Sequence, residues 1–344
     1  MNNIDSINIK NYIKKKKEIK GMIKSYAEKF YYLMKLGREF ELRAKEEYMK
    51  GNISGFLHLA IGEEATHVGA MLGFGKGDFF VHYREHVYAL ARGMSPKELM
   101  AELFGKKTGV SKGKGGSMHL YSSKFNFYGG NAIVGAQIPH AVGAAYARKY
   151  LGHMEGVMVA FGDGATNAGN FYESLNLAAV YKVPLLFLCE NNYYAIGTRI
   201  DRVSAFKDLY LKAKDYMPAI QVDGMDVFAV FEAVSKAKEY IETEGKPFFI
   251  EALTYRYEPH SMSDSGDYRS PRELKIAKDR DPIQKLIDRG LEEGFLTEEY
   301  IKSVDEKVQQ EIEEAVEFAL NSPEPDMDEL YKDVYCEVCE NVIS

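Results

Sequence analysis

The stretches VMVAFGDG (Val157–Gly164) and VPLLFLCENN (Val183–Asn192) decide the fold of this chain. Each begins with a continuous apolar run and ends in residues that favour turns. Between them, Asn170–Tyr181 has the apolar spacing of a helix. A strand, a helix and a strand in so short a space form a βαβ unit, whose strands are parallel and buried on both faces. A third apolar run, Phe248–Thr254, follows a predicted helix at Val227–Glu244, so the parallel sheet continues.

This pattern predicts an α/β fold with a doubly wound, mostly parallel sheet, helices on both of its faces and helical extensions at both ends of the chain. Working outward, we expect a lysine-rich arm at 1–22, an α/β domain at 23–281, and a charged helical tail at 282–344 packed on the same domain. Within the domain, Ile23–Met49 has the periodicity of a helix. The glycine-rich stretch Phe104–Gly130 is expected to be irregular.

The composition argues against several classes of protein. A net charge of −7 offers no basic face for nucleic acid, and the longest apolar stretches are too short to span a membrane. The run Lys14–Lys17 has no apolar segment beside it, so we expect no secretory signal. Three sparse cysteines argue against a disulfide framework and favour a reducing, cytoplasmic location. The pair Cys336 and Cys339 alone is weak evidence for a zinc site.

Polar side chains follow two neighbouring strands of the predicted sheet. Asp163 follows the first strand and Asn192 the second, and the carboxyl ends of parallel strands meet at one edge. Carboxylate and amide oxygens suit magnesium, which would complete its shell with a phosphorylated ligand that the backbone at Gly162 and Gly164 could approach. Taken singly, each segment could be an ordinary turn or loop, and only their joint position favours the magnesium site. The sequence lacks GxxxxGK[ST] and GxGxxG, which disfavours a P-loop or dinucleotide site.

Gly162-Asp163-Gly164, followed after 26 residues by Asn191-Asn192, resembles the thiamine-diphosphate motif of transketolase-like and 2-oxo acid dehydrogenase enzymes. From about Ile23 to Pro282 the chain resembles alpha subunits of thiamine-diphosphate-dependent 2-oxo acid dehydrogenases, closest to those of the pyruvate dehydrogenase component. The blocks that carry this resemblance are GFLHLAIGEEA (Gly55–Ala65), HYREH (His82–His86), GKGGSMHL (Gly113–Leu120), YGGNAIVGAQIP (Tyr128–Pro139), GDGATNAGNFYESLN (Gly162–Asn176), CENNYYAIGT (Cys189–Thr198) and YRYEPHSMSDSGDYR (Tyr255–Arg269).

The resemblance implies the thiamine-diphosphate-binding fold, with thiamine diphosphate and Mg²⁺ as cofactors. The residues implied to hold magnesium are Asp163 and Asn192 through their side chains and Tyr194 through its backbone carbonyl. The residues implied to contact the diphosphate are Gly164, Ala165, Tyr83 and Arg84. Ile133 and Val134 are implied to lie under the aminopyrimidine, and His58 and His260 to face the reacting end.

On sequence alone, the histidines carry less information. His58 lies in an apolar segment and could be a core residue, whereas His260 lies in the long polar loop Glu258–Pro271, and long loops are often functional. Ser261 matches a serine that some members of the family phosphorylate, although an ordinary loop serine is the simpler reading. Five others are expected to be structural or on the surface: His67, His82, His86, His140 and His153.

The resemblance further implies oxidative decarboxylation of pyruvate, with acyl transfer to lipoamide on a partner acyltransferase. The glutamate that activates the aminopyrimidine would belong to a beta subunit, giving an α2β2 tetramer in which small residues on Ala136–Tyr150 could form a contact. Acetoin or a branched-chain 2-oxo acid is the alternative substrate, and a non-catalytic subunit that binds magnesium and phosphate is the alternative from another class. Two departures from the family pattern are Ala132, in place of glycine, and Glu258-Pro259 at the loop entry.

Overall fold

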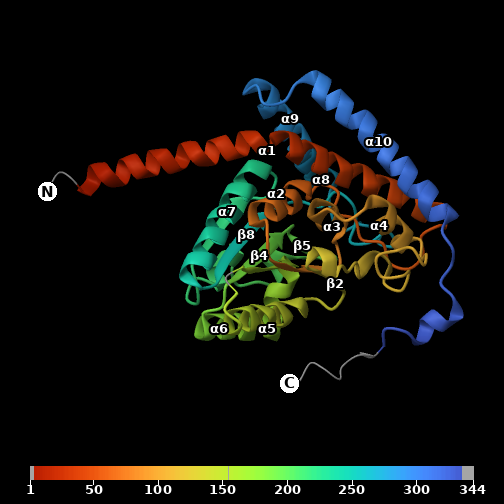
Figure 1. Cartoon of the computed structure of the whole chain (residues 1–344), viewed down its shortest axis with the longest axis horizontal. Coiled ribbons are helices and arrows are strands. Elements are labelled where there is room, and N and C mark those ends of the chain that lie inside the picture. Colours follow the sequence, from red (N-terminus) through yellow and green to blue (C-terminus); the bar gives the residue numbers. More distant parts are fainter. Residues whose placement is uncertain (1–3, 154, 335–344) are drawn as a thin grey trace.

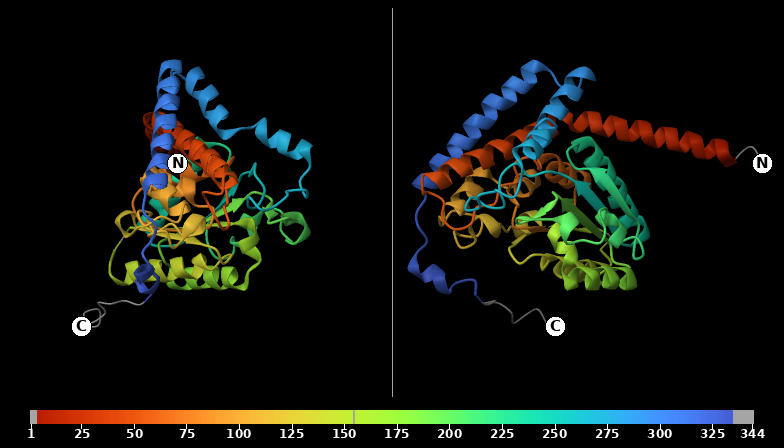
Figure 2. Two further views of the ribbon diagram at one scale, coloured as in Figure 1. Left: turned by 90° about the vertical axis from the view of Figure 1, so that its right-hand side faces the viewer. Right: turned by 180° about the vertical axis from the view of Figure 1, so that it is seen from behind.

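In the computed structural model, a parallel sheet lies between two layers of helices (Figure 1). The structure describes residues 4–153 and 155–334. The first helix, α1 (Ile4–Met49), projects beyond the body of the molecule at its N-terminal end (Figures 1 and 2). Among the described residues, no helix combines the length and apolar character needed to cross a membrane. Further α-helices are α2 (Glu64–Phe74), α3 (His86–Arg92), α4 (Pro96–Leu103), α5 (Gln137–Tyr150), α6 (Gly169–Tyr181), α7 (Val227–Glu244), α8 (Pro271–Lys278), α9 (Pro282–Glu292) and α10 (Glu298–Asn321).

The main sheet has six parallel strands in the order β2-β1-β3-β4-β8-β7. β3 and β4 lie at its centre, and the register pairs Gly162 with Glu190. Since all six strands run in one direction, the loops that follow β1, β3, β4 and β8 emerge at the same edge. The strands are β1 (Asp78–His82), β2 (Phe127–Asn131), β3 (Val157–Gly162), β4 (Leu185–Asn191), β7 (Ala219–Asp223) and β8 (Phe248–Leu253), and a separate antiparallel pair is β5 (Tyr194–Ala195) with β6 (Thr198–Arg199).

Each face of the sheet has its own apolar core, as predicted for a doubly wound fold. α5 and α6 cover one face, where Phe161 and Phe171 are fully buried together. On the other face, α2 and α7 are covered in turn by α1, where Phe30 packs edge-on against Phe231. Alternate residues of β3 belong to the two cores, which explains why its sequence is a continuous apolar run.

Several predicted boundaries are wrong. α1 begins at Ile4 rather than near residue 23, so one helix continues through the expected end of the lysine-rich arm; lysine and glutamate favour helices, and no proline interrupts this segment. β4 extends to Asn191, so Glu190 and Asn191 lie within the strand rather than after it. The division of the chain into arm, domain and tail stays a prediction.

The glycine-rich stretch after α4 is mostly irregular, as predicted, although its end forms β2. One carboxylate organises it. Glu102 Oε2 accepts hydrogen bonds from the backbone N–H groups of Ser111 (2.8 Å) and Gly113 (2.9 Å), and Oε1 accepts from Gly115 (2.8 Å) and Gly116 (3.1 Å). The loop therefore wraps around an anion that the chain itself supplies.

In the part of the tail that the structure describes, up to residue 334, the chain is helical through α9 and α10, and the only helical segment after Asn321 is the short 3₁₀ turn η6 (Met327–Tyr331). We call residues 322–334 the C-terminal strap. Its acidic side chains pair with the lysines of the glycine-rich stretch, and Lys107 N–H also donates to Pro323 O at 3.0 Å. Cys336 and Cys339 lie outside the described residues. The pairs are Lys106 with Glu324, Lys107 with Asp326, and Lys112 and Lys114 with Asp333.

Candidate active site

A cavity of about 170 Å³ opens at the edge of the sheet where the sequence predicts the site. It brings together most of the residues that the sequence analysis singled out. These lining residues are Tyr83, Arg84, Val134, Asp163, Gly164, Ala165, Asn192, Tyr194 and His260. Two others are not among the lining residues: His58, which is buried, and Ile133, which has 71% of its surface exposed.

Asp163 begins the 3₁₀ turn η3 (Asp163–Asn167) directly after β3. Its side chain is 1% exposed, and its Oδ2 atom has no hydrogen-bond partner. Burial raises the pKa of Asp163 to about 7. Lys212 holds the turn from below by donating to Thr166 O at 3.2 Å and to Asn167 Oδ1 at 2.9 Å. The chain thus supports a carboxylate whose own charge is left uncompensated.

Gly164 allows η3 to approach the β5–β6 pair. A Cβ atom at this position would lie 2.7 Å from Ala195 Cβ, closer than two carbon atoms can come without a shift. The glycine therefore brings the backbone of Tyr194, at the start of β5, beside the turn that carries Asp163. The sequence pattern pointed to Gly164 as an approach to phosphate, and this packing requirement is an additional reason for it.

Asn192 follows β4 and is oriented by its neighbours. Its Nδ2 atom donates to Glu63 Oε1 at 3.0 Å, and Tyr194 N–H donates to Asn192 Oδ1 at 3.3 Å. Glu63 is fully buried, its Oε2 atom has no hydrogen-bond partner, and burial raises its pKa. The cavity therefore has an amide oxygen from one strand end beside a carboxylate from the next, as predicted.

Arg84 follows β1 and joins three segments of the site. Its Nη1 atom donates to Leu59 O at 2.7 Å and its Nη2 atom to His260 O at 3.0 Å. Its Nε atom lies 3.7 Å from Glu63 Oε2. The guanidinium is 4% exposed, so this buried cation both lines the cavity and fixes the segments that carry the two candidate histidines.

His58, Tyr83 and His260 form a cluster of rings beside the cavity. The ring centroids of His58 and His260 are 5.0 Å apart, and those of His58 and Tyr83 are 4.6 Å apart. Burial lowers the pKa of His58 to about 2 and that of His260 to about 4, and the nearby Arg84 acts in the same direction. Both imidazoles are therefore neutral at physiological pH and can each donate one hydrogen bond and accept another.

The expectation that five histidines are structural or on the surface holds for four of them. His140 and His153 are exposed, and His67 and His86 are buried away from the cavity. For His82 the expectation stays a prediction, because this residue lines the cavity at the end of β1, directly before Tyr83 and Arg84. Its position at the end of a strand could have revealed it, had β1 been recognised.

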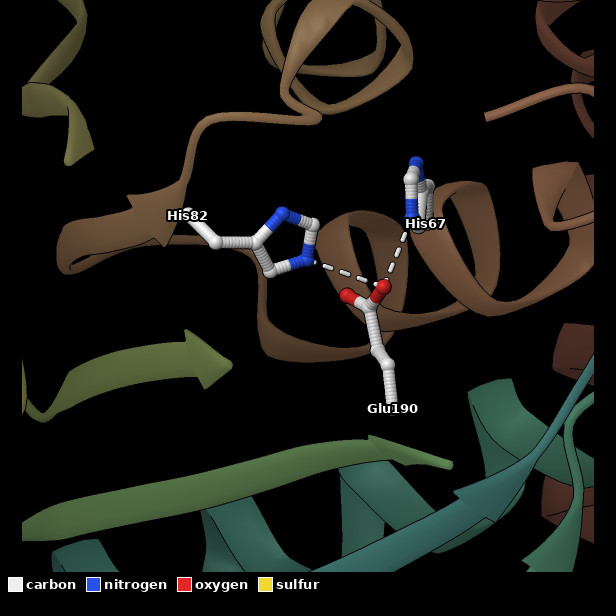
Figure 3. A group of neighbouring side chains, drawn as sticks. All are labelled: His67, His82 and Glu190. Atoms are coloured by element: carbon white, nitrogen blue, oxygen red, sulfur yellow. Dashed lines mark hydrogen bonds and ion pairs between the residues drawn. The ribbon is translucent and has the colours of Figure 1, made fainter. Parts of the chain in front are cut away.

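Two buried charged residues near the site, Glu190 and Arg256, were not predicted from the sequence. Glu190 lines the cavity, and its carboxylate meets His67 and His82, which approach it from two sides (Figure 3). Burial opposes its charged form, yet the two imidazoles lower the pKa of Glu190 below its usual range. Arg256, after β8, is 2% exposed, and its Nε and Nη1 atoms have no hydrogen-bond partner. No local motif marks either residue, because their partners come from distant segments.

These charges fit a ligand that carries charge of both signs. The free Oδ2 atom of Asp163 and the oriented amide of Asn192 are the oxygen donors that a divalent cation prefers. Arg84, which lines the cavity, supplies positive charge for an anionic group. Since a buried carboxylate is unfavourable without a counterion, a cation bound to Asp163 would relieve the electrostatic cost.

A larger cavity of about 630 Å³ lies beside the edge strand β7 and helix α8. Four of its charged residues form two pairs: Arg280 Nη2 lies 3.2 Å from Asp223 Oδ2, and Arg199 Nη1 lies 3.5 Å from Glu273 Oε1. The smaller cavity is therefore the candidate active site, because it combines the strand ends with uncompensated charge.

The chain is similar to known proteins along most of its length. A family model described as "Dehydrogenase E1 component" matches residues 32–328. The chain is 45% identical over 309 residues to the pyruvate dehydrogenase E1 component subunit alpha of Rhizobium meliloti, with 89% of each chain covered. It is 43% identical over 311 residues to the somatic, mitochondrial form of this subunit from Bos taurus, and 44% identical over 310 residues to the one from Homo sapiens. The two alignments cover 90% and 89% of this chain and 79% of each relative.

Proposed function

Because this chain belongs to the dehydrogenase E1 component family, we propose that it is the alpha subunit of a pyruvate dehydrogenase E1 component. The enzyme would decarboxylate pyruvate oxidatively and pass the acetyl group to lipoamide on an acyltransferase. Identities of 43–45% over about nine-tenths of the chain with relatives that carry this name support the assignment. A cytoplasmic location stays a prediction.

One observation carries the proposed chemistry of the site: Asp163 and Asn192 both line the cavity, and the buried Oδ2 atom of Asp163 has no hydrogen-bond partner. We infer that Asp163, Asn192 and the backbone carbonyl of Tyr194 hold Mg²⁺. Gly164, Ala165, Tyr83 and Arg84 would then contact the diphosphate of thiamine diphosphate. When bound, this cofactor supplies the carbon nucleophile and the electron sink for decarboxylation.

The remaining residues would hold and shape the reacting end. His58 and His260 are neutral, so they would offer hydrogen bonds to substrate without adding a second positive charge beside Arg84. Val134 would contact the aminopyrimidine, and Ile133 would complete that surface once its exposed side chain is covered. Ser261 is 7% exposed and bonded to Ser263 Oγ at 3.0 Å, so its phosphorylation would first require the loop to open.

We infer that the chain works with a beta subunit. The relatives are named as one subunit of a larger component. In support, the outer side of α5 and α6 exposes a row of apolar and aromatic side chains, and Gly143 on α5 faces open space. A partner would cover this surface, together with Ile133, in an α2β2 tetramer. The exposed residues are Tyr146, Tyr150, Leu151, Val180 and Tyr181.

Coexpression with a beta subunit from the same genome tests the proposal. Decarboxylation would be followed with an artificial electron acceptor, and pyruvate, branched-chain 2-oxo acids and acetoin would be compared at equal concentration. We expect the highest kcat/KM with pyruvate and little turnover by the alpha chain alone. A preference for acetoin or a branched 2-oxo acid would change the substrate assignment, and binding of magnesium and phosphate without turnover in the complex would favour a non-catalytic subunit.

Asp163→Ala in the same complex tests the metal site. We expect loss of activity by at least about 100-fold, since one of the proposed metal ligands and the charge it supplies are removed. Asp215→Ala is the matched control, because Asp215 is an exposed carboxylate outside the cavity lining. Full activity of Asp163→Ala would refute the magnesium role.

A further inference from the structure

The buried carboxylate of Glu190, which lines the cavity, contacts side chains from three other elements. Glu190 Oε2 lies 3.0 Å from His67 Nε2 and 2.9 Å from His82 Nε2, and Tyr88 Oη donates to Glu190 Oε1. His67 belongs to α2, His82 ends β1, and Tyr88 belongs to α3. Figure 3 shows the two imidazoles converging on the carboxylate. We call these four residues the Glu190 tie; each is at most 7% exposed.

The Glu190 tie spans the central strand of the site. In the sheet, β3 lies between β1 and β4, so the contact from His82 to Glu190 passes over the end of β3, where the register places Gly162. Asp163 follows Gly162 and begins η3. Tyr83 and Arg84 follow the tie on one side and Asn192 follows it on the other. The tie therefore connects the end of β1 to the end of β4, and Asp163 lies between these two strand ends.

Three residues of the Glu190 tie, His67, His82 and Glu190, could be mistaken for a metal site, because their ligand atoms lie within 4.8 Å of one another. The tautomer of His82 argues against this. Arg84 N–H donates to His82 Nδ1 at 3.1 Å, so the neutral ring carries its proton on Nε2. A protonated Nε2 has no lone pair for a metal, and this atom lies 2.9 Å from Glu190 Oε2 as a close polar contact rather than a regular hydrogen bond. Tyr88 meanwhile occupies the other oxygen of the carboxylate.

We propose that His82, His67 and Tyr88 are positioning residues for the cofactor-binding edge, acting through Glu190. This inference rests on the proposed function of the same site. The three side chains contribute by holding β1 and β4 in place, so that Arg84 on one side and Asn192 on the other face the same ligand. Loss of the tie widens this edge and weakens cofactor binding more than it slows turnover of the loaded enzyme.

Two substitutions of one residue separate the contacts of His82. His82→Gln places an amide N–H near the position of Nε2 and keeps the donor to Glu190, whereas His82→Asn keeps an acceptor near Nδ1 for Arg84 N–H but cannot reach Glu190. The affinity for thiamine diphosphate at saturating Mg²⁺ would be measured by calorimetry on the complex with the beta subunit. We expect His82→Asn to bind about tenfold more weakly and His82→Gln to stay within about threefold of the unmodified complex.

Tyr88→Phe provides a second test that removes only a hydroxyl from the tie. We expect about threefold weaker cofactor binding, with an unfolding temperature close to that of the unmodified complex. His153→Asn, at an exposed histidine outside the cavity lining, is the matched control and should bind normally. In each tie variant, kcat at saturating cofactor should change by a smaller factor than the dissociation constant does.

Each other outcome overturns the inference. Normal binding by both His82→Asn and Tyr88→Phe would remove the positioning role, and equal losses in His82→Asn and His82→Gln would show that the imidazole ring itself matters rather than its contact with Glu190. Co²⁺ spectra typical of histidine ligation in the unmodified complex, absent from His82→Asn, would replace the tie by a metal site. Failure of the unmodified complex to bind thiamine diphosphate is a different result, because it contradicts the proposed function itself.

Discussion

Asp163 is a residue whose contribution to stability and whose contribution to function have opposite signs. Its buried carboxylate has an oxygen without a partner, and Glu63 close by has another. Like charges in a site that excludes water repel each other, so the cation-free protein holds these groups at an electrostatic cost. Such cost is characteristic of sites that are complete only when a ligand is bound.

Asp163→Asn should therefore stabilise the metal-free protein while it prevents cofactor binding. The amide keeps the size of the side chain and removes the buried charge, so we expect the free energy of unfolding to rise by about 1–3 kcal/mol. Urea unfolding in the presence of a chelator measures this change. Asn192→Asp is the matched variant with the opposite sign, because it adds a carboxylate to the same place. A metal-free Asp163→Asn protein that is less stable would contradict this account.

The histidine cluster predicts how stability depends on pH. His260 has a folded pKa of about 4 against an unfolded value of 6.5, so below pH 6.5 the unfolded chain binds a proton that the folded chain does not. The stability that neutral His260 contributes is present above pH 6.5 and is lost as the pH falls toward 4. After allowance for its partial exposure, we expect a loss of about 1 kcal/mol.

Unfolding curves at pH 7 and pH 5 test this expectation. The difference in free energy of unfolding between the two values should shrink in His260→Gln, which cannot take up the proton. His153→Gln, at an exposed histidine, should leave the difference unchanged. An equal pH dependence in His260→Gln and the unmodified protein would show that other groups are responsible.

Among the strands, β3, β4 and β8 could be predicted from sequence and the others could not, whereas helices such as α6 and α7 could be predicted. β3, β4 and β8 are buried on both faces, so their own residues form continuous apolar runs. β1 starts with Asp78, which is neutralised by the distant Arg148, β2 contains two adjacent glycines, and β7 is a half-exposed edge strand. Their pairing depends on contacts with the finished sheet, which no local pattern records.

The residues of the candidate active site also divide into those that the sequence predicts and those that it does not. Asp163 and Asn192 could be placed from topology alone, because each follows a recognisable strand. The residues implied by family resemblance also gather at the cavity, except Ile133 and His58. Glu63 and Glu190 could not be found, because their contacts with Asn192 and His67 join segments 129 and 123 residues apart in the chain.

Glu102→Gln should loosen the glycine-rich loop. A carboxylate accepts from four backbone N–H groups there, whereas an amide presents its own N–H₂ to two of them and leaves those donors unpaired. We expect a local cost of about 2–3 kcal/mol, seen as faster hydrogen exchange of the amides of residues 109–116. Glu98→Gln, on an exposed position of the same helix, is the control. Unchanged exchange in Glu102→Gln would show that the loop does not depend on this anion.

At the scale of the whole molecule, helix α10 and the C-terminal strap are held to the body by different interactions. Apolar packing joins α10 to the body, with Val308 and Ala315 fully buried. The C-terminal strap is instead held by ion pairs between exposed side chains, and its larger apolar residues face outward. Exposed pairs contribute about 0–1 kcal/mol each and are screened by salt, so the strap is the layer most sensitive to ionic strength. These outward residues are Met327, Leu330, Tyr331 and Val334, with exposures of 82%, 67%, 79% and 60%.

Raising the NaCl concentration to about 1 M should release the strap before the body unfolds. Trypsin cleavage at Lys332 would then accelerate severalfold, while the far-ultraviolet circular dichroism of the body stays constant. Lys112→Glu combined with Lys114→Glu should produce the same acceleration at low salt, because both lysines pair with Asp333. Lys302→Glu, at an exposed lysine on α10, should not. Cleavage that is independent of salt would mean that the strap is held by other forces.

The arrangement around Glu190 also bears on how such a sequence can drift over evolutionary time. A substitution that removed one histidine would leave the buried carboxylate of Glu190 without one of its two imidazole contacts. A buried charge that loses a partner destabilises the protein. Homologues should therefore exchange positions 67, 82 and 88 in concert, and families of sequences in which one of the three varies independently of the others would speak against a shared role.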